Sequence, residues 1–305
     1  MATKPTSEIK SIAEQIQVKE GLIEAGELAV DISVDGLAPW SYSKAKVLAK
    51  CPFQFYLKYI LKIKTPETPI SLITEVGKAA HRILEFVIGG KDITRAYNLT
   101  RKEFLDTITD EEWAEHVDTL HFNISKFQER MQEFDVKNKV KRFFQEIKMG
   151  VTRDFEPTGF FADNVFYRSV IDLIIQLENG DILIIDHKTG APSITGTKNY
   201  RDQLNTYKIM FHYGIEKVAG AQSGIHFIRD GEVAIDDYSP AKDIEGKLFK
   251  DLMLTLEGAV DGVKDKGFFK HIAGTSCKYC EYAEDCKAGK LKDIEKKTVR
   301  FFKKD

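Results

Sequence analysis

The chain has 305 residues, of which 43% are hydrophobic and 30% charged, enough apolar material for one large domain or a core with an inserted subdomain. Its net charge of −2 neither indicates nor excludes a nucleic-acid partner. No stretch reaches the ~18 apolar residues of a membrane span, and the opening MATKPTSEIK lacks the apolar segment of a secretory signal. We therefore expect a cytoplasmic protein with no membrane partner.

The first part of the chain predicts helices. Residues 1–36 are polar and weakly helical, so we expect an arm or a short helix there. Residues 41–63 indicate a helix whose N-cap is Ser41 or Ser43, and residues 71–89 indicate a second helix.

A helical insertion is expected over about 90–149. From residue 100 to residue 149 the chain is charged and contains neither Pro nor Gly, and its apolar residues recur at spacings of three and four. The periodic residues are Phe104, Leu105, Trp113, Val117, Leu120, Phe127, Met131, Phe134, Val140, Phe143 and Phe144. This spacing predicts two or three helices, with the aromatic residues in their core.

β-Structure is expected from about residue 151. The runs FYRSVIDLIIQL (166–177) and DILIIDHKT (181–189) are rich in β-branched residues, and Asn179-Gly180 between them is typical of a hairpin turn. A helix, a strand and a further helix are then predicted over residues 200–213, 220–228 and 241–266.

Polar side chains in the hairpin are candidates for catalysis. Asp186 and Lys188 are two residues apart on the second strand and so share a face. Two carboxylates brought close together repel unless a divalent cation joins them, and a lysine beside them suits phosphate chemistry. The alternative is an exposed hairpin with an ordinary Asp–Lys ion pair. A two-residue turn would place Asp172 opposite His187, so the catalytic interpretation requires a three-residue loop or a bulge.

The four cysteines are spaced for one shared metal centre. Cys277, Cys280 and Cys286 form C-x2-C-x5-C, and Cys51 stands alone near the start. Clustered cysteines in a reducing compartment more often bind metal than form disulfides. Zinc and an iron–sulfur cluster are both open at this point.

The end of the chain is basic. Residues 287–305 carry eight Lys or Arg against three acidic residues. A solvated tail and a tail that contacts phosphates are both consistent with this composition.

Together, these residues resemble the RecB-type nucleases of the PD-(D/E)XK superfamily. The motifs G-x-x-x-H, Asp, D-x-K followed by Thr-Gly, and Q-x-x-x-Y occur in that order, as Gly77–His81, Asp172, Asp186–Gly190 and Gln203–Tyr207. Cys51-Pro52 together with the terminal C-x2-C-x5-C resembles the iron–sulfur subgroup, which includes AddB nuclease domains and small CRISPR-associated exonucleases. The resemblance covers about residues 40–290; Ser169 departs from it, because the family often has Gly three residues before the Asp.

The resemblance implies a fold and its divisions. The fold would be α/β, a restriction-endonuclease-like mixed sheet flanked by helices, with an iron–sulfur clasp that joins N- and C-terminal segments. The divisions would be an arm (1–36), a nuclease domain (37–290) and a basic tail (291–305). Within the domain, the insertion would span about 90–149 and the cluster-binding segments 41–63 and 268–290.

It also implies roles for single residues. His81, Asp172, Asp186 and the backbone carbonyl of His187 would hold Mg²⁺ or Mn²⁺, and Lys188 would stabilise the negative charge that develops during cleavage. Gln203 and Tyr207 would position the DNA backbone. Cys51, Cys277, Cys280 and Cys286 would hold a [4Fe–4S] cluster as a structural clasp.

The implied activity is a metal-dependent exonuclease on single-stranded or end-bearing DNA. An end-processing endonuclease in recombination or CRISPR adaptation is the second hypothesis, and a catalytically idle iron–sulfur DNA-binding module is the third. DNA is the expected partner, and a helicase or a recombination or adaptation complex is the expected assembly.

Overall fold

A computed structural model of the protein describes residues 11–24, 31–65, 71–190, 194–266 and 269–287. The chain divides into two compact units, one formed by residues 1–68 and 252–305 and the other by residues 69–251. Among the described residues, no helix is both long enough and apolar enough to cross a membrane. The predicted basic tail (291–305) lies outside the described residues.

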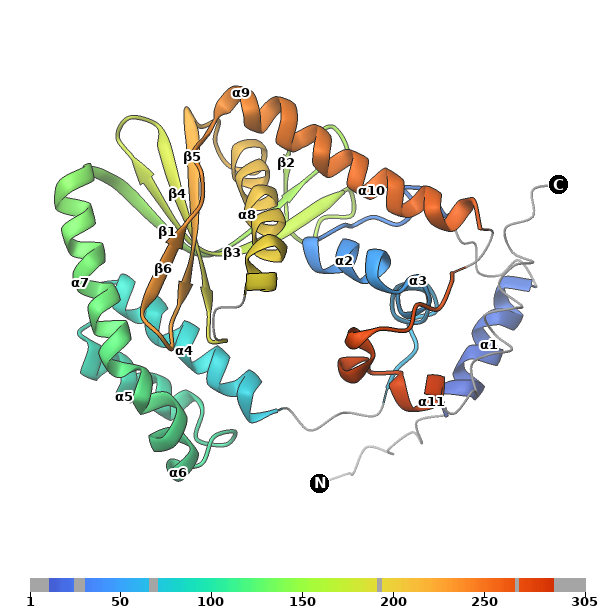
Figure 1. Ribbon diagram of the computed structural model, residues 1–305, viewed down its shortest axis with the longest axis horizontal. Helices are drawn as coiled ribbons and strands as arrows, with labels where there is room; N and C mark the ends of the chain where they lie inside the picture. The colour runs from blue at the N-terminus through green and yellow to red at the C-terminus, as the bar shows by residue number, and fades with distance from the viewer. Residues whose placement is uncertain (1–10, 25–30, 66–70, 191–193, 267–268, 288–305) are drawn as a thin grey trace. The chain divides into compact units, whose positions relative to one another are not determined.

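A mixed sheet forms the centre of the 69–251 unit (Figure 1). The strand order is β2-β1-β3-β4-β5-β6, with β7 paired to β5; only the β4–β5 pair is parallel. The strands are β1 (Val140–Val151), β2 (Pro157–Thr158), β3 (Tyr167–Leu177), β4 (Asp181–Lys188), β5 (Gly220–Phe227), β6 (Glu232–Ile235) and β7 (Ser239–Pro240). The prediction of a mixed sheet with helices around it is confirmed.

Helices cover both faces of this sheet (Figure 1). One face carries α4 (Leu72–Ile88), α5 (Ile93–Glu103), α6 (Asp110–Glu112), the π-helix η2 (Trp113–Val117), the 3-10 helix η3 (Asp118–Leu120) and α7 (His121–Asn138). The helix that covers the other face is α8 (Ile194–Gly214). Phe144 of β1 packs on Phe211 of α8 at 5.5 Å between ring centroids, whereas its neighbour Gln145 lies beside Gly89 at the end of α4. Because successive strand residues point to opposite faces, α8 and α4 lie on opposite sides of the sheet.

The apolar residues of β3 and β4 explain why these helices pack where they do. Leu173, Ile175, Leu183 and Ile185 are buried with α4, η2 and α7 in one hydrophobic cluster. Residues at the alternate positions, including Asp172 and Asp186, therefore face the α8 side. At ~1.5–3 kcal/mol for each buried aliphatic side chain, this cluster is a main source of stability for the sheet.

One predicted element is wrong. Residues 140–149 were expected to continue the helical insertion, but they belong to strand β1, which pairs antiparallel with β3. Lys139, with φ 52°, ends α7 in a left-handed conformation, and the strand begins at the next residue. The spacing of Phe143, Phe144 and Ile147 is also compatible with a helix. The segment is a strand because it pairs with β3.

The β3–β4 hairpin has the register that the catalytic interpretation requires. Its loop consists of residues 178–180, and Gly180 adopts a positive φ of 86°. Leu173 pairs with Ile185, so continuing the register places Asp172 opposite Asp186. The catalytic interpretation required either a three-residue loop or a bulge, and the structure has the three-residue loop.

The other unit contains segments from both ends of the chain. Its helices are α1 (Ile12–Glu24), α2 (Tyr42–Lys50), α3 (Pro52–Phe55), the π-helix η1 (Tyr56–Ile60), the 3-10 helix η5 (Thr275–Tyr279) and α11 (Ala283–Lys287). Helix α10 (Phe249–Lys264) contributes its residues from 252 onwards to this unit. The two short helices before it, α9 (Ala241–Asp243) and η4 (Ile244–Leu248), belong to the 69–251 unit.

The single helix predicted over 41–63 is divided in the structure. Ser41 caps α2 by accepting a hydrogen bond from the backbone N–H of Lys44, as expected. The helix then stops at Cys51, which has an extended backbone with φ −151° and ψ 94°. Pro52 explains the break, because a residue before proline is disfavoured in the helical region.

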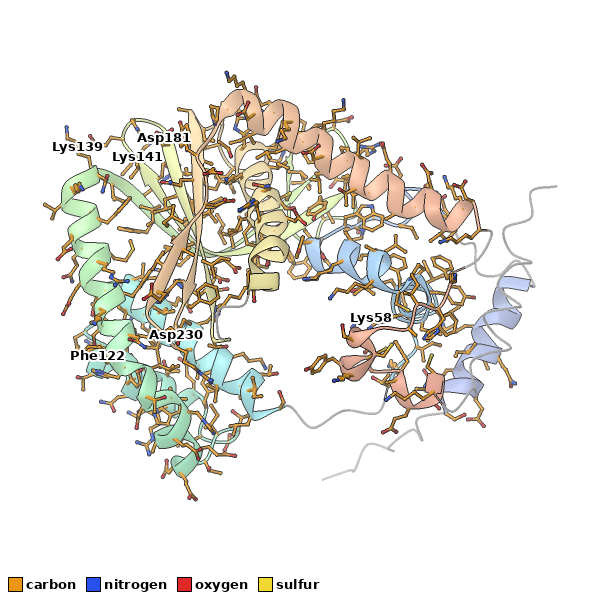
Figure 2. All side chains as sticks on the ribbon, in the orientation of Figure 1. Lys58, Phe122, Lys139, Lys141, Asp181 and Asp230 are labelled. Atoms are coloured by element: carbon orange, nitrogen blue, oxygen red, sulfur yellow. The ribbon has the colours of Figure 1, made fainter. Side chains whose placement is uncertain are left out.

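Aromatic packing and side-chain hydrogen bonds join the two chain segments of this unit. Phe269 stacks on Tyr56 with ring centroids 5.0 Å apart, and the Tyr282 hydroxyl donates to the carbonyl of Ile63 at 3.1 Å. Lys58, labelled in Figure 2, forms a 2.7 Å ion pair with Glu281. These contacts bring residues more than 200 positions apart into one small core.

Candidate active site

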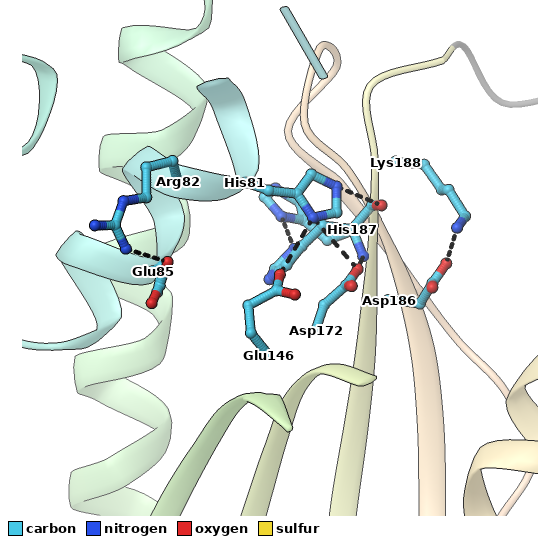
Figure 3. A network of polar contacts seen from close by, with 9 residues as sticks. His81, Arg82, Glu85, Glu146, Asp172, Asp186, His187 and Lys188 are labelled. Atoms are coloured by element: carbon cyan, nitrogen blue, oxygen red, sulfur yellow. Dashed lines mark hydrogen bonds and ion pairs between the residues drawn. The ribbon is translucent and has the colours of Figure 1, made fainter. Parts of the chain in front are cut away.

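The candidate site lies where strands β3 and β4 separate. Their ladder ends at Leu173 and Ile185, one residue before the two aspartates. There the Asp172 carboxylate accepts a hydrogen bond from the backbone N–H of His187 at 2.7 Å (Figure 3). A side chain thus replaces the strand partner, which leaves the sheet open at this point while satisfying the backbone donor.

Asp186 and Lys188 form a close pair on β4. The Lys188 ammonium is 2.7 Å from the Asp186 carboxylate, whose side chain is only 2% exposed. The same ammonium lies 5.5 Å from the ring centre of Tyr200 on α8, a cation–π distance. The lysine is therefore held at the mouth of the site with its charge near the buried carboxylate.

His81 reaches the same place from helix α4. Its Nε2 is 3.1 Å from the backbone carbonyl of His187, and its Nδ1 is 3.8 Å from the Asp172 carboxylate. Gly77, one turn earlier on α4, passes close to Thr189, since a Cβ added there would lie 3.5 Å from the threonine hydroxyl. The G-x-x-x-H helix and the strand that carries D-x-K are thus in direct contact.

The side chain of His187 points away from the carboxylates. Its ring is 5.3 Å from Phe127 on α7, and its Nδ1 is 3.0 Å from Nδ1 of His226 on β5. Burial lowers the pKa of the His187 imidazole well below its ordinary value. This side chain is part of the core, and only its backbone takes part in the site.

Sequence reasoning missed Glu146, which the structure brings to the site. This residue is flanked in the β1–β3 ladder by the pairs Gln145–Leu173 and Ile147–Ile171, so it lies opposite Asp172. Its carboxylate is 3.6 Å from Nδ1 of His81. Even if strand β1 had been predicted, the sequence would not have placed Glu146 opposite Asp172, because the long β1–β3 connection does not fix the register of the two strands.

Gln203 and Tyr207 contact each other on α8. The Gln203 amide donates to the Tyr207 hydroxyl at 2.6 Å, so the tyrosine proton is directed to another acceptor. Burial raises the pKa of Tyr207, and the negative charges of Asp186 and Asp172 raise it further. The pair therefore borders the carboxylates, as the Q-x-x-x-Y motif predicts.

Electrostatics at the site favour a cation. Burial raises the pKa of Asp172 to about 6, although His81 opposes the shift, and burial also raises the pKa of Asp186. Burial alone would lower the pKa of His81, but the Glu146 and Asp172 carboxylates outweigh it and the pKa is raised. Carboxylates that resist ionisation and a histidine that retains a proton both indicate unbalanced negative charge.

The donor set fits a divalent metal ion. Oxygen ligands from aspartates and a histidine nitrogen suit Mg²⁺ or Mn²⁺. The donor atoms of His81, Glu146 and Asp172 all lie within 4.8 Å of one another. The Asp186 carboxylate instead faces Lys188. The predicted residues therefore lie close together, but their carboxylates do not all face the same position.

A cleft adjoins this site. It has a volume of about 470 Å³ and is lined by Gly77, Lys78, His81, Arg82, Glu85, Glu103, Phe104 and Glu146. On its walls, Lys78 is paired with Glu75, and Arg82 with Glu85 and Glu103. The cleft opens the His81–Glu146 side of the site to solvent.

The four cysteines line one cavity in the other unit. This cavity has a volume of about 220 Å³, and its remaining walls include Phe53, Leu57 and Tyr282. The backbone N–H of Gly274 lies 3.4 Å from the Cys277 sulfur, and burial raises the pKa of the Cys280 thiol. Four cysteine side chains gathered in an apolar pocket fit a metal centre, which would bind them as thiolates.

Comparisons with known proteins identify a family and two solved structures of low similarity. The profile of the PD-(D/E)XK nuclease superfamily matches residues 39–287. A solved structure from Eubacterium rectale, named "putative exonuclease", is 11% identical over 86% of this chain and 88% of its own, with a TM-score of 0.40. The structure of SSO0001 is 13% identical over 90% of this chain and 95% of its own, with a TM-score of 0.31. No curated protein matches the chain.

Proposed function

The chain belongs to the PD-(D/E)XK nuclease superfamily, and from that premise we propose that it is a divalent-metal-dependent DNA exonuclease that acts on single-stranded or end-bearing DNA. The observation that carries the proposal is the meeting of Asp172, Asp186, Lys188 and His81 at the open end of the β3–β4 ladder. Nucleases of this superfamily use divalent metals such as Mg²⁺ or Mn²⁺, and the oxygen-rich donor set described above is consistent with either.

Each side chain has a separate task in the proposed reaction. His81, Asp172, Asp186 and the backbone carbonyl of His187 would hold the metal ion, which when bound would lower the pKa of a water molecule and neutralise charge on the scissile phosphate. Lys188 projects from the same face as the aspartates and would stabilise negative charge on the phosphate oxygens. Tyr207, whose hydroxyl accepts from Gln203, would donate its own proton to a phosphate oxygen and so position the DNA backbone.

The four cysteines complete the proposal. Cys51, Cys277, Cys280 and Cys286 would hold a [4Fe–4S] cluster that fastens the N-terminal and C-terminal segments of their unit together. Four cysteine side chains in one apolar cavity support this role, and they could also hold zinc. Protein purified without oxygen should be brown, with about four irons per chain; colourless protein with one zinc would refute the cluster and retain the clasp.

The test of the nuclease is cleavage of end-labelled DNA by anaerobically purified protein. Linear and circular single strands are compared with Mg²⁺, with Mn²⁺ and with EDTA, and we expect cleavage of the linear strand only when metal is present. Cleavage of the circle would favour the endonuclease hypothesis. Binding without cleavage under every condition would favour the idle DNA-binding module.

Two variants separate metal binding from catalysis. Asp186→Ala removes a ligand, so it should lose both activity and metal affinity. Lys188→Ala leaves the ligands in place and should bind metal nearly normally while cleaving ~10²–10³-fold more slowly, as expected for loss of one charge-stabilising group. If both variants cut linear DNA at the unmodified rate, the activity belongs to a contaminant.

A further inference from the structure

We propose that one face of the β1–β3 ladder binds a single-stranded segment of the DNA substrate beside the site of cleavage. Lys148 and Arg168 would contact its phosphates, and Phe160 and Phe161 would stack on its bases. This inference rests on the proposed function, because it extends the substrate along the strand that carries Asp172.

The accessible face of β3 begins at Asp172. Buried and half-buried residues alternate over 167–172, whereas residues 173–176 are all buried. Because side chains at every second position of a strand point to the same face, the half-buried Asp172, Val170 and Arg168 lie on one face. Four residues at ~3.3 Å each place Arg168 ~13 Å from Asp172 along the strand. The face that carries the catalytic carboxylate therefore continues as an accessible surface away from the site.

Two cations on this face are available for phosphates. Lys148 is exposed and is the β1 partner of Val170, and residues paired across a ladder share a face. Among the residues that the structure describes, neither Lys148 nor Arg168 has an ion-pair partner. The cleft on the His81 side differs, because its Lys78 and Arg82 are both paired with glutamates. Unpaired cations beside a site that cleaves phosphodiesters suit contacts with the DNA backbone.

Two adjacent phenylalanines lie at the far end of the same face. The loop before them folds over Gly150, the β1 partner of Arg168, since a Cβ added at Gly150 would lie 2.9 Å from the carbonyl oxygen of Gly159. The Arg168 guanidinium is 5.1 Å from the ring centre of Phe160, and the ring centroids of Phe160 and Phe161 are 4.8 Å apart. Phe161 is 79% exposed. An exposed aromatic ring beside a cation is the combination that holds single strands in many proteins.

A single strand fits this face better than a duplex. Bases within a duplex are already stacked on their neighbours, whereas an unpaired base has a free face for Phe161. The ~13 Å from Asp172 to Arg168 corresponds to about four nucleotides of a stacked strand at ~3.4 Å each. A strand whose scissile phosphate is at the aspartates would therefore reach the phenylalanines within a few nucleotides.

The test measures binding of DNA, not its cleavage. Fluorescence anisotropy of a labelled 20-nucleotide thymidine strand is followed without added divalent metal, so that the strand stays intact. Phe161→Ala should bind this strand at least fivefold more weakly, the lower end of the range for one lost base–aromatic stack. It should bind an abasic strand of the same length as well as the unmodified protein does. Urea unfolding establishes that the variant is folded.

The two cations have a separate signature. Lys148→Ala and Arg168→Ala should weaken binding of both the thymidine strand and the abasic strand. Each should also reduce the slope of log K against log salt by about 0.7, the value for one phosphate contact on a single strand. A variant that only loosened the fold would not change this slope by one contact.

Phe122→Ala is the matched control. Phe122 is 65% exposed and lies 4.3 Å from the Lys126 ammonium, so it presents the same combination on α7 and not on the β1–β3 ladder. This variant should bind both strands as the unmodified protein does. Equal affinity of Phe161→Ala and the unmodified protein for the thymidine strand, an equal loss in Phe122→Ala, or unchanged salt slopes in the two cation variants would overturn the inference.

The inference and the proposed function can fail separately. If metal-dependent cleavage is present and the Phe161 and cation variants bind DNA normally, the function stands and this binding face is wrong. If these variants lose affinity as expected but the unmodified protein cleaves no DNA, the binding face stands and the nuclease does not.

Discussion

Removal of the Asp172 charge should stabilise the metal-free protein, although it removes a proposed metal ligand. The Asp172 side chain is 14% exposed, and its carboxylate shares the site with Asp186 and Glu146. In the absence of metal, the folded state must keep the Asp172 carboxylate ionised where little solvent reaches it. Asn has nearly the same shape, and its side-chain oxygen can still accept from the His187 backbone N–H.

The magnitude follows from the pKa. Burial raises the pKa of Asp172 from 3.8 in the unfolded chain to about 6 in the folded one. Because the folded state holds the proton more tightly, stability decreases as the pH rises from about 4 to about 6, and the full penalty remains above that range. Two pKa units correspond to ~3 kcal/mol, so Asp172→Asn should raise the free energy of unfolding at pH 8 by about 1–3 kcal/mol, allowing for relaxation of the site.

The assay is urea unfolding at pH 8 in EDTA and again in Mn²⁺. The unmodified protein should gain stability from the ion, by ~2.7 kcal/mol at a hundredfold excess over the dissociation constant, whereas Asp172→Asn should gain much less. A decrease of more than 1 kcal/mol for Asp172→Asn in EDTA would refute the reasoning, because it would mean that the ionised carboxylate is well satisfied without metal.

Three further outcomes are expected. Cys51→Ala should lose the visible absorbance of the anaerobic protein and lower its thermal midpoint, while Mn²⁺ binding is retained; loss of Mn²⁺ binding in a folded variant would contradict a purely structural clasp. Gln203→Ala should raise the KM for DNA and leave Mn²⁺ affinity unchanged, because the amide contacts Tyr207 and not the metal ligands. Burial lowers the pKa of His212, whose Nδ1 accepts from the backbone N–H of Val218, so stability should fall as the pH drops below ~6.5. Unfolding curves from pH 7.5 to 5.5 should show a smaller fall for His212→Gln.

The sequence predicts the hairpin well because its information is local. The β-rich runs and the Asn179-Gly180 turn predict β3 and β4, whereas the sequence left open a two-residue turn, a three-residue loop and a bulge, and the register in the structure decides among them. Helix α4, predicted over 71–89, follows from an equally local signal, and the structure shows that Ser71 caps it. These elements hold most of the proposed catalytic residues.

The missed parts depend on contacts between distant residues. Strand β1 has an ambiguous apolar pattern, and it becomes a strand because it pairs with β3 along most of its length. Glu146 enters the site through that pairing alone. The break at Cys51 is different, because its cause, Pro52, is local in the sequence. It was missed because the segments on both sides of it have a helical pattern.

The order in which the ribosome delivers the chain has a consequence for the cysteine unit. That unit takes residues from both ends, whereas the sheet unit is one continuous segment, 69–251. Cys277 follows Cys51 by 226 positions, so at ~5–20 residues per second Cys51 waits roughly 10–45 s for its partners. The sheet unit can therefore be complete before the cysteine pocket exists, and binding of the proposed cluster or ion there would wait until the last of these cysteines is translated.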